Sequence, residues 1–580
     1  MNVPSPVTTI QTFCSRLVRR FVGGSALMHC LLIISLGLAI YANTFQVPFL
    51  FDDISCIAEN PSLGTYFDRF VPDDKHHADM EPDIINSMQL RSVTYLTFAL
   101  NFRLHGIDVA GYHAVNLLIH LTTAVLVYLL MAAILTTPFF CDHPASRASR
   151  HTLPLVVALL FVSHPIQTSA VTYIAQRFTS LATLFYLLSL VFYLKARTTQ
   201  GPKLRTAFLV GSVVVSAVGM YTKEILFTLP VMAAVCEIMF LQGSLGTRIK
   251  SLVPLLCTML IIPFNTLSNS DAVGGIVNHL DDSINLANLN NISQWEYFYT
   301  QFRVIVTYLR LLVLPINQHM DYDYPRYSSI VAPPVLASFL LLLCLAFSGG
   351  WIFLRSRKDT PAAWAQRMFA FGVTWFFVTI SMSSSIIPLD DMIFEYRLYL
   401  PSTGFFLAVT TMALLARQRL EVREGRLERM AMVGAAVVVL VIGSLSITAF
   451  TRNHTWGTAV RFWEDNVEKA PNKARPHYNL GTAYVYGHRL TDAIAQYHEA
   501  IRVAPTRLSQ HEPLYNIARC YEELHRRQEA LNFYETALQI KPYDYQTVMW
   551  YGQLLATVGR YKESKQQLEF AERLRAAYNK

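Results

Sequence analysis

Long apolar stretches recur through the first 450 residues of the chain and then stop. Stretches such as LLIISLGLAIYA, FLVGSVVVSAVGM and MVGAAVVVLVIGSLSITAF approach the ~20 residues that a helix needs to cross a hydrocarbon core of ~30 Å. With 53% hydrophobic and 15% charged residues, the 580-residue chain is too apolar for an ordinary soluble protein. Beyond about Arg452 the sequence turns polar and charged. An all-α chain is therefore predicted, with a polytopic membrane domain at 1–451 and a soluble domain at 452–580.

The lysines and arginines gather in short connections between the apolar stretches. Short cytoplasmic loops are enriched in these residues, so we interpret the net charge of +8 as a topology signal and not as a nucleic-acid site. Placing every basic loop on the cytoplasmic side predicts about eleven spans, with two long external segments and an external C-terminal domain. The exterior would be a periplasm, outside an inner membrane, or an endoplasmic reticulum lumen. The external segments are 45–112 and 265–331. The spans are expected near 26–41 and 114–135, on each side of SHPIQ and of YTKE, and near 252–264, 331–354, 369–387, 398–415 and 430–450.

One apolar segment, 301–315, is not assigned as a span. It carries Arg303 and Arg310, which are two helical turns apart and so lie on one face. If it crossed, the basic loop at 355–367 would move outside, against the positive-inside rule. We expect an external, interfacial or re-entrant helix with both arginines facing the site.

The last 110 residues repeat with a period near 34, which is typical of tetratricopeptide repeats. Small residues stand where two helices must approach closely, aromatic residues lie beside them, and proline ends each of the first two units. Three repeats are predicted, at about 474–507, 511–544 and 545–578. The positions matched between the first two are His477, Leu480, Gly481, Tyr484, Ala493, Tyr497, Ala500 and Pro505, with Leu514, Ile517, Ala518, Tyr521, Ala530, Tyr534, Ala537 and Pro542.

The concave face of such a stack usually binds an extended peptide or a partner helix. Tyr478, Asn479, Tyr515 and Asn516 are the candidates for contacts with an acceptor protein. A rigid spacer or an assembly contact is the alternative use of the same repeats.

Charged and polar residues also stand near the predicted external ends of the spans, where residues at membrane depth are generally functional or paired. Asp52 and Asp53 follow the first span. A few carboxylates on the same side as many cations suit a site that binds a lipid phosphate and activates a hydroxyl. The other members of this set are Arg91, His113, Asn116, His164, Arg177, Lys223, Glu224, Arg303, Arg310, Asp390, Asp391, Glu395 and Arg397.

Sugar transfer from a polyprenyl phosphate would need these residue types. The phosphate is a good leaving group, so it requires cations and no general acid. The acceptor hydroxyl requires one carboxylate base on the opposite side, which gives inversion at the anomeric carbon. Asp52 or Asp53 would be the base, and Lys223, Arg177 and Arg397 the cations.

Each candidate also has a purely structural interpretation. The two aspartates can form a solvated helix boundary, and Lys223 can pair with Glu224 to cap a span. Glu395 and Arg397 can pair locally, and His164 with its following proline can simply end a helix. These alternatives stay open at the level of the sequence.

A metal site is a weaker hypothesis. The segment 72–83, PDDKHHADMEPD, offers His76, His77 and several carboxylates. Their spacing matches no metal site that we can assign, so a solvated loop is favoured and dependence on a divalent metal stays undecided. The pattern indicates no other cofactor.

Several blocks in a specific order resemble the transmembrane and tetratricopeptide-repeat-containing protein O-mannosyltransferases, of the GT-C glycosyltransferase class. The blocks are FLFDDISCIAENPSL, RSVTYLTFALNFRLHGIDVAGYHAVNLLIHL, FVSHPIQTSAVTYIAQR, YTKEILFTLP, EYRLYLPSTGF and the terminal repeats. The resemblance covers nearly the whole chain. It implies a GT-C membrane domain with an external active site, a polyprenyl-phosphate sugar donor, and transfer to Ser or Thr of a protein.

By that resemblance Asp52 matches the first acidic position of the family's motif, the expected base, and Asp53 the second. Arg177 matches the arginine after the His-Pro block; Lys223 with Glu224, and Glu395 with Arg397, match two further blocks. Two positions depart from the family. Ser92 replaces a common proline, and Thr179 replaces a frequent aspartate, so the identity of the sugar, mannose by the family's name, stays open.

Two other functions fit parts of the same pattern. An enzyme with the same donor would transfer the sugar to a glycan or a lipid. A non-enzymatic membrane scaffold would work through its repeats alone, and would need neither Asp52 nor Arg397.

Overall fold

Helices make up all of the regular secondary structure in the described part of the chain, as the sequence predicts. The computed structural model describes residues 24–64, 66, 87–141, 149–269, 292–356, 360, 362–385, 387–389, 391–424 and 427–578. Two compact units are present. The first ends at His454, and the second begins at Thr455 and also includes the segment His319–Tyr324.

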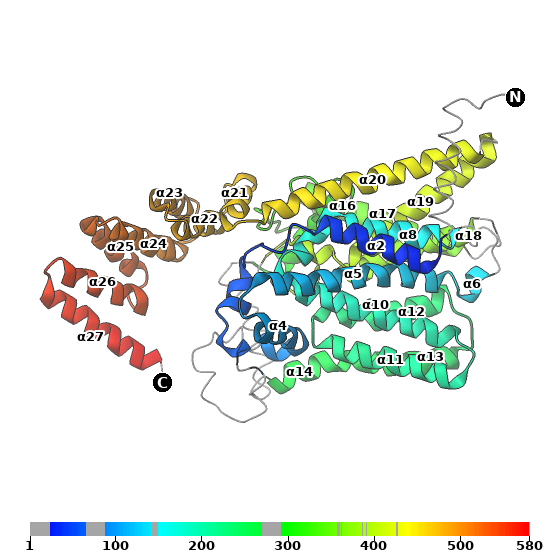
Figure 1. Cartoon of the computed structure of the whole chain (residues 1–580), viewed down its shortest axis with the longest axis horizontal. Helices are drawn as coiled ribbons and strands as arrows, with labels where there is room; N and C mark the ends of the chain where they lie inside the picture. Colours follow the sequence, from blue (N-terminus) through cyan, green and yellow to red (C-terminus); the bar gives the residue numbers. More distant parts are fainter. Residues whose placement is uncertain are drawn as a thin grey trace. The chain divides into compact units, whose positions relative to one another are not determined.

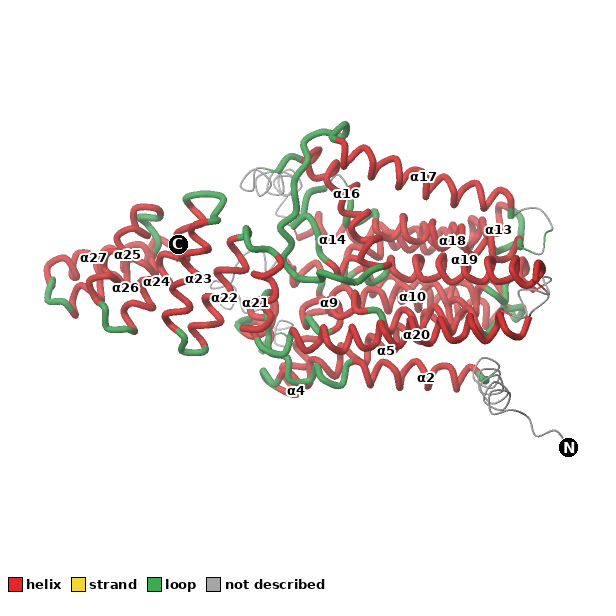
Figure 2. Tube along the Cα trace, turned by 90° about the horizontal axis from the view of Figure 1, so that it is seen from above, coloured by secondary structure: helices red, strands yellow, loops and turns green. Residues whose placement is uncertain are grey.

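The long helices of the first unit run side by side (Figures 1 and 2). Helix α4 lies at one end of the bundle and α6 at the other (Figure 1). Its helices are α2 (Ala26–Ile40), α4 (Ser92–His105), α5 (Val109–Ile134), α6 (Pro138–Cys141), α8 (Thr152–Ser163), α9 (Thr168–Val171), α10 (Arg177–Thr198), α11 (Pro202–Met220), α12 (Leu229–Met239), α13 (Leu245–Cys257), α14 (Ile261–Asn269), α16 (Gln294–Val313), α17 (Pro333–Arg355), α18 (Ala363–Ile380), α19 (Pro401–Glu424) and α20 (Leu427–Thr455).

Among the described residues, six helices are long and apolar enough to cross a membrane, and a seventh candidate is the bent pair formed by α8 and the segment Pro165–Val171. Every predicted span coincides with a helix or a run of helices, but several of these are short; α2 has 15 residues and α12 has 11. The number of crossings therefore stays a prediction.

Burial separates central from peripheral helices. The most apolar windows of α5 and α10 are 72% buried, whereas that of α20 is only 11% buried. The side chains of Leu440 and Ile447 on α20 are 71% and 68% exposed. Large exposed apolar surfaces mark contact with a partner or a membrane, so these outer helices have the surface expected of helices that face lipid.

Two glycines let α18 and α19 pack backbone to backbone. A Cβ placed on Gly372 would lie 2.6 Å from the carbonyl oxygen of Gly404, and one on Gly404 would lie 2.5 Å from the carbonyl oxygen of Gly372. Small residues at such crossings are how membrane helices approach closely without a hydrophobic driving force. Any side chain at either position would push these two helices apart.

The helix α16 is amphipathic and does not qualify as a span by composition. Its buried face carries Tyr297, Gln301 and Tyr308, and their side chains hydrogen-bond to backbone groups of 383–394. These contacts hold the turn that precedes α19.

Short turns connect the long helices and carry most of the predicted site residues. The π-helical turn η1 follows Asp53, and 3-10 turns begin after His164, Tyr173, Lys223 and Phe394. Pro165 cannot continue α8, and the His164 Nδ1 accepts the next free backbone N–H, from Ile166 at 3.1 Å. The turns are η1 (Ile54–Ala58), η2 (Pro61–Leu63), η5 (Pro165–Gln167), η6 (Ile174–Gln176), η7 (Glu224–Thr228), η8 (Thr258–Leu260) and η9 (Glu395–Leu398).

The second unit is a stack of antiparallel helix pairs (Figures 1 and 2). A single helix, α21 (Ala459–Lys469), precedes the pairs. At the first crossing a Cβ on Gly481 would lie 2.7 Å from the Tyr497 ring, which explains the small residue at this position of the repeat. The pairs are α22 (Ala474–Tyr486) with α23 (Leu490–Arg502), α24 (His511–Glu523) with α25 (Arg527–Ile540), and α26 (Tyr545–Thr557) with α27 (Tyr561–Tyr578), and the turn η10 (Leu508–Gln510) precedes α24.

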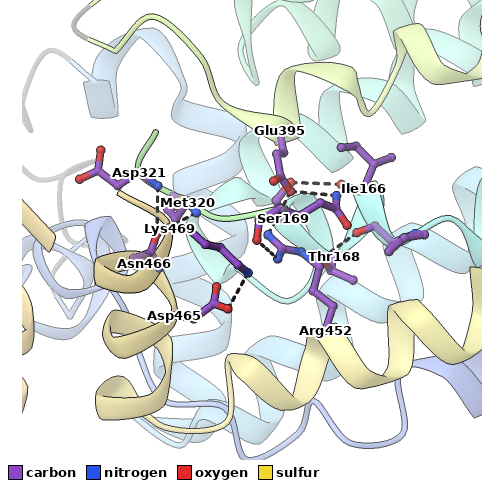
Figure 3. Close-up of polar contacts among 12 residues, drawn as sticks. Ile166, Thr168, Ser169, Met320, Asp321, Glu395, Arg452, Asp465, Asn466 and Lys469 are labelled. Carbon is purple, nitrogen blue, oxygen red and sulfur yellow. Dashed lines mark hydrogen bonds and ion pairs between the residues drawn. The ribbon is translucent and has the colours of Figure 1, made fainter. Parts of the chain in front are cut away.

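A segment from far upstream, His319–Tyr324, is an integral part of this second unit. The Asn466 side-chain oxygen accepts two consecutive backbone N–H groups, from Met320 at 2.9 Å and Asp321 at 3.0 Å (Figure 3). The Asp321 carboxylate is 2% exposed; Arg475 donates two hydrogen bonds to it and Lys473 forms an ion pair with it. The segment is thus held by both backbone and charge.

We expect Asn466→Ala to release this segment in the full-length protein. The substitution removes the acceptor of both backbone N–H groups while keeping a good helix former in α21. Hydrogen exchange read by mass spectrometry should show the amides of Met320 and Asp321 exchanging at least about tenfold faster than in the wild type. The exposed Asn532→Ala is the matched control. Fast exchange of these two amides in the wild-type protein would contradict the assignment.

Candidate active site

Two adjacent aspartates at the end of the first helix have different surroundings. Asp53 is 1% exposed and accepts backbone N–H groups from Leu50 at 3.0 Å and Ala175 at 2.5 Å. Burial raises the pKa of Asp53 well above its ordinary value. Asp52 is half-buried, and its backbone N–H donates to the Tyr173 hydroxyl at 3.1 Å. Asp53 therefore fixes the loop, and Asp52 is the carboxylate left at the surface of the site.

Lys223 places a half-buried ammonium group among neutral partners. Its Nζ donates to Thr179 Oγ1 at 2.7 Å and to Gln176 Oε1 at 3.4 Å, and lies 4.7 Å from the centre of the Tyr396 ring. None of these contacts in the described ranges is a carboxylate. Burial and then the charge of Arg91 lower the pKa of Lys223 to about 7, while the carboxylates of Glu224 and Asp52 act in the opposite direction.

Arg91 forms an ion pair with Glu224, the residue that the sequence suggested as a partner of Lys223. Its Nε and Nη2 donate to Glu224 Oε1 at 3.1 and 2.9 Å, and its guanidinium lies over the Phe178 ring at 5.3 Å. Burial alone would raise the pKa of Glu224, but the charge of Arg91 lowers it overall. The alternative in which Lys223 pairs with Glu224 is therefore wrong, because Glu224 is bonded to Arg91.

Arg397 lies in the turn before α19 and is 8% exposed. Its guanidinium donates to the backbone oxygens of Met392 at 3.2 Å and Asp391 at 2.9 Å. Burial would lower the pKa of Arg397, but the neighbouring tyrosines, Tyr308 first, raise it, so the group stays a cation. Its charge also contributes to lowering the pKa of Lys223, which places the two cations in one electrostatic environment.

Glu395 does not contact Lys223 or Arg397 in the hydrogen bonds described here; its carboxylate is bonded elsewhere. Its Oε2 accepts a hydrogen bond from Arg452 Nη2 at 3.1 Å (Figure 3). The same oxygen accepts from Gln318 Nε2 at 3.1 Å, and Arg452 also donates to the Gln318 backbone oxygen at 2.6 Å. The pair is buried, at 9% and 1% side-chain exposure. The alternative in which Glu395 pairs locally with Arg397 is therefore wrong, and Glu395 instead connects the turn η9 to the end of α20.

Arg177 is entirely buried inside the bundle and does not face the proposed phosphate position. Its guanidinium lies 4.5 Å from the centre of the Phe98 ring. The structure thus contradicts the expectation that Arg177 grips the donor, because its nitrogens already donate to interior groups of α4 and α5. The acceptors are the Asn116 and Asn101 side chains, each at 2.7 Å, both oxygens of Thr97 at 3.2 Å, and the backbone oxygen of Tyr112 at 3.1 Å.

We expect Arg177→Met to destabilise the fold. The change leaves several buried acceptors without a donor, and the free energy of unfolding should fall by about 3 kcal/mol or more. Thermal melting of purified protein in detergent measures the loss. The exposed Arg205→Met on α11 is the control and should melt as the wild type does. A variant with unchanged melting but weakened donor binding would return Arg177 to the site.

Three other predicted donor contacts lie elsewhere. His164 is 1% exposed, and besides capping η5 it contacts the backbone oxygen of Leu312 at 3.2 Å, so its structural interpretation fits. Arg310 is exposed and donates to the backbone oxygen of Ile316 at 3.3 Å. Arg303 is half-buried on α16, outside the face that carries Tyr308. Arg310 therefore bonds outside the group around Lys223, contrary to the expectation that it faces this group, and the role of Arg303 stays a prediction.

The predicted acceptor contacts all lie on the first helices of the repeats and are partly exposed. Tyr478 and Asn479 are on α22, and Tyr515 and Asn516 are on α24. The Asn516 side chain donates to the Tyr478 hydroxyl at 3.1 Å, which links two successive repeats. Their role in binding an acceptor stays a prediction.

The described residues contain no group of three or more histidine, cysteine, aspartate or glutamate side chains arranged to hold a metal ion. The candidate segment 72–83 lies outside the described residues.

The structure adds neutral residues that charge patterns do not reveal. Tyr173, Gln176 and Thr179 come from one turn and the start of α10, and Tyr396 comes from η9. They contact Asp52 or Lys223 directly. The family resemblance had already singled out Thr179, whereas only proximity to a block containing Arg177 could have suggested Tyr173 and Gln176.

Comparisons with known proteins agree with the sequence blocks. A tetratricopeptide-repeat family model matches residues 472–542. A protein O-mannosyl-transferase of Caenorhabditis elegans, F38B6.6, is 24% identical over 82% of this chain and 63% of its own length. Mouse TMTC4, also a protein O-mannosyl-transferase, is 25% identical over 80% of this chain and 64% of its own. Human TMTC2 is 29% identical over 38% of this chain and 25% of its own.

The chain is therefore a homologue of the TMTC protein O-mannosyl-transferases, at about 24% identity over about four-fifths of its length. This confirms the resemblance found in the sequence. The chain spans between about half and two-thirds of the length of the relatives matched along most of it.

Proposed function

We propose that this TMTC homologue is a membrane glycosyltransferase that moves a sugar from a polyprenyl-phosphate donor to a Ser or Thr hydroxyl of a protein. The site lies around Asp52 and Lys223, on the non-cytoplasmic side of the membrane. The names of the relatives support transfer to protein. The lipid donor and the sidedness are supported by the position of charged residues at the ends of apolar helices.

In the proposed reaction the acceptor hydroxyl oxygen attacks the anomeric carbon of the donor sugar. The new carbon–oxygen bond forms as the bond between that carbon and the phosphate oxygen breaks. The phosphate leaves with the electron pair, and the hydroxyl proton passes to the Asp52 carboxylate. Direct displacement by one nucleophile with one base inverts the configuration at the anomeric carbon.

One observation carries this assignment more than any other. The Lys223 ammonium is half-buried and its contacts are neutral, so burial is not compensated by a bound carboxylate. A buried cation in that state favours an anionic ligand, and a lipid-borne phosphate is the anion that transfer chemistry supplies. The charge of Asp52 acts on Lys223 and raises its pKa, which supports the proposal that base and cation belong to one site.

Arg91 and Arg397 would take secondary parts. Both are held by protein oxygens, Arg91 by Glu224 and Arg397 by backbone groups, so each would add positive potential without having to release a partner. The repeats would recruit the acceptor protein through the row that contains Tyr478 and Tyr515.

A reconstituted reaction tests the proposal. Purified full-length protein in lipid vesicles would receive a polyprenyl-phosphate mannose and a protein fraction from its host as acceptor. Mass spectrometry should find Ser or Thr residues heavier by one hexose. A labelled glycolipid with unmodified protein would favour the lipid or glycan acceptor instead. No transfer to any acceptor, with a separately verified donor, would contradict the proposal.

A further inference from the structure

One short turn contacts both halves of the proposed site. At its start the Tyr173 hydroxyl accepts the Asp52 backbone N–H at 3.1 Å and donates a hydrogen bond to the Asp52 carboxylate. At its end Gln176 Oε1 accepts from Lys223 Nζ at 3.4 Å and from Thr179 Oγ1 at 2.8 Å. Base and cation are therefore held by residues only three positions apart in the chain.

The turn is anchored from beneath by a buried network. The Asn116 amide donates to the backbone oxygens of Val171 and Ile174, each at 3.2 Å, and its oxygen accepts from Arg177 Nε at 2.7 Å. Ala175 is fixed through its N–H to Asp53. Buried polar networks in which each member has partners are rigid, so this turn is a firm support for the groups above it.

We propose that Tyr173 is a positioning residue for Asp52: its hydroxyl orients the carboxylate toward the acceptor and stabilises its ionised form. The inference rests on the proposed function. The hydroxyl meets Asp52 at two points, through the backbone N–H and the side chain, so it fixes both the loop and the direction of the carboxylate. A carboxylate with one oxygen engaged by a donor presents the other oxygen for proton removal.

The burial of Tyr173 is compatible with its proposed role as a hydrogen-bond donor to Asp52. Tyr173 is 1% exposed, and burial followed by the charge of Asp52 raises its pKa well above the ordinary value. The hydroxyl therefore keeps its proton across the working range of pH and remains a donor. The ring also packs 6.4 Å from the Phe51 ring, centre to centre, a contact that phenylalanine would preserve.

The test compares Tyr173→Phe with Tyr186→Phe in the full-length protein. Tyr186 is buried on α10, and its hydroxyl accepts from Thr228 Oγ1 at 3.3 Å, so the control removes a hydroxyl of similar burial from outside the site. Rates at saturating donor and acceptor would be recorded from pH 5 to pH 9, together with the KM for donor and the melting temperature.

We expect Tyr173→Phe to lower kcat about tenfold near neutral pH, with an unchanged KM for donor. The acidic limb of its pH profile should move to higher pH, because the ionised carboxylate has lost a donor. Tyr186→Phe should keep the wild-type profile. An unshifted profile and a full rate in Tyr173→Phe would overturn the inference, provided that Asp52→Asn is inactive. Activity in Asp52→Asn would instead remove the proposed function itself.

Discussion

Asp52→Asn is expected to reduce sugar transfer by at least about 10³-fold, the loss typical of removing a general base. The amide has nearly the shape of the carboxylate but cannot take the hydroxyl proton. Because Asp52 is half-buried and Asp53 holds the loop, the variant should reach the membrane and melt as the wild type does. Mass spectrometry of a modified acceptor measures the rate, and binding of a labelled donor shows that the site is still formed.

Asp108→Asn is the matched control for this substitution. The Asp108 side chain caps α5 by accepting the Ala110 N–H at 3.1 Å, and asparagine is an equally good cap. This variant should keep both its stability and its rate. Wild-type transfer by Asp52→Asn would refute the assignment of the base.

Lys223→Met is expected to raise the KM for the lipid donor about 100-fold, because a charge-assisted contact to the phosphate is lost in a half-buried position. The methionine side chain fills similar space and leaves Thr179 and Gln176 hydrogen-bonded to each other. Acceptor KM should change little. Lys195→Met, an exposed position near the other end of α10, is the control. Unchanged donor KM in Lys223→Met would place the phosphate elsewhere.

The lowered pKa of Lys223 also predicts that donor binding depends on pH. Because the pKa of Lys223 is lowered to about 7, the ammonium is present below pH 7 and is lost as the pH rises. A sugar phosphodiester has no group that titrates in this range, so donor affinity should fall above pH 7, approaching about tenfold per pH unit. Lys223→Arg stays charged and should bind donor almost independently of pH from 7 to 9. Equal pH dependence in the two proteins would count against Lys223 as the phosphate ligand.

The sequence was a good guide to the helices because apolar stretches, basic loops and a 34-residue period each leave a local signal. It was also a good guide to charged residues held at helix ends, such as Arg91 and Lys223. Their partners were harder to predict. Glu224 follows Lys223 directly, yet it bonds Arg91, which is 133 positions away. Pairing across that distance is decided by packing and not by neighbourhood in the chain.

The role of Arg177 was predicted wrongly for another reason. A cation in a block that resembles the family suggests phosphate binding. Inside the bundle, however, its hydrogen bonds are accepted by the neutral side chains of Asn101, Asn116 and Thr97 and by the backbone oxygens of Thr97 and Tyr112. Neutral acceptors carry no charge signal, so the sequence did not reveal that this arginine is structural. For the same reason the sequence did not point to Tyr173, whose contact with Asp52 spans 121 positions.

The long-range contact of Glu395 with Arg452 was missed for a related reason. Arg452 stood at the polar end of the last apolar stretch, where a cation is ordinarily a boundary residue. Its guanidinium instead compensates the buried Glu395 carboxylate, and breaking such a pair by removing one member is costly. Arg452, a charged residue at the predicted end of a span, therefore stabilises the fold and has no part in the proposed chemistry.

A structure of the full-length protein with a bound polyprenyl phosphate tests most directly whether Lys223 and Asp52 form the active site. A phosphate oxygen is expected within about 4 Å of Lys223 Nζ, the distance of an ion pair, with the Asp52 carboxylate facing the position of the transferred sugar. A lipid phosphate bound away from Lys223, with Asp52 facing only solvent, would contradict it.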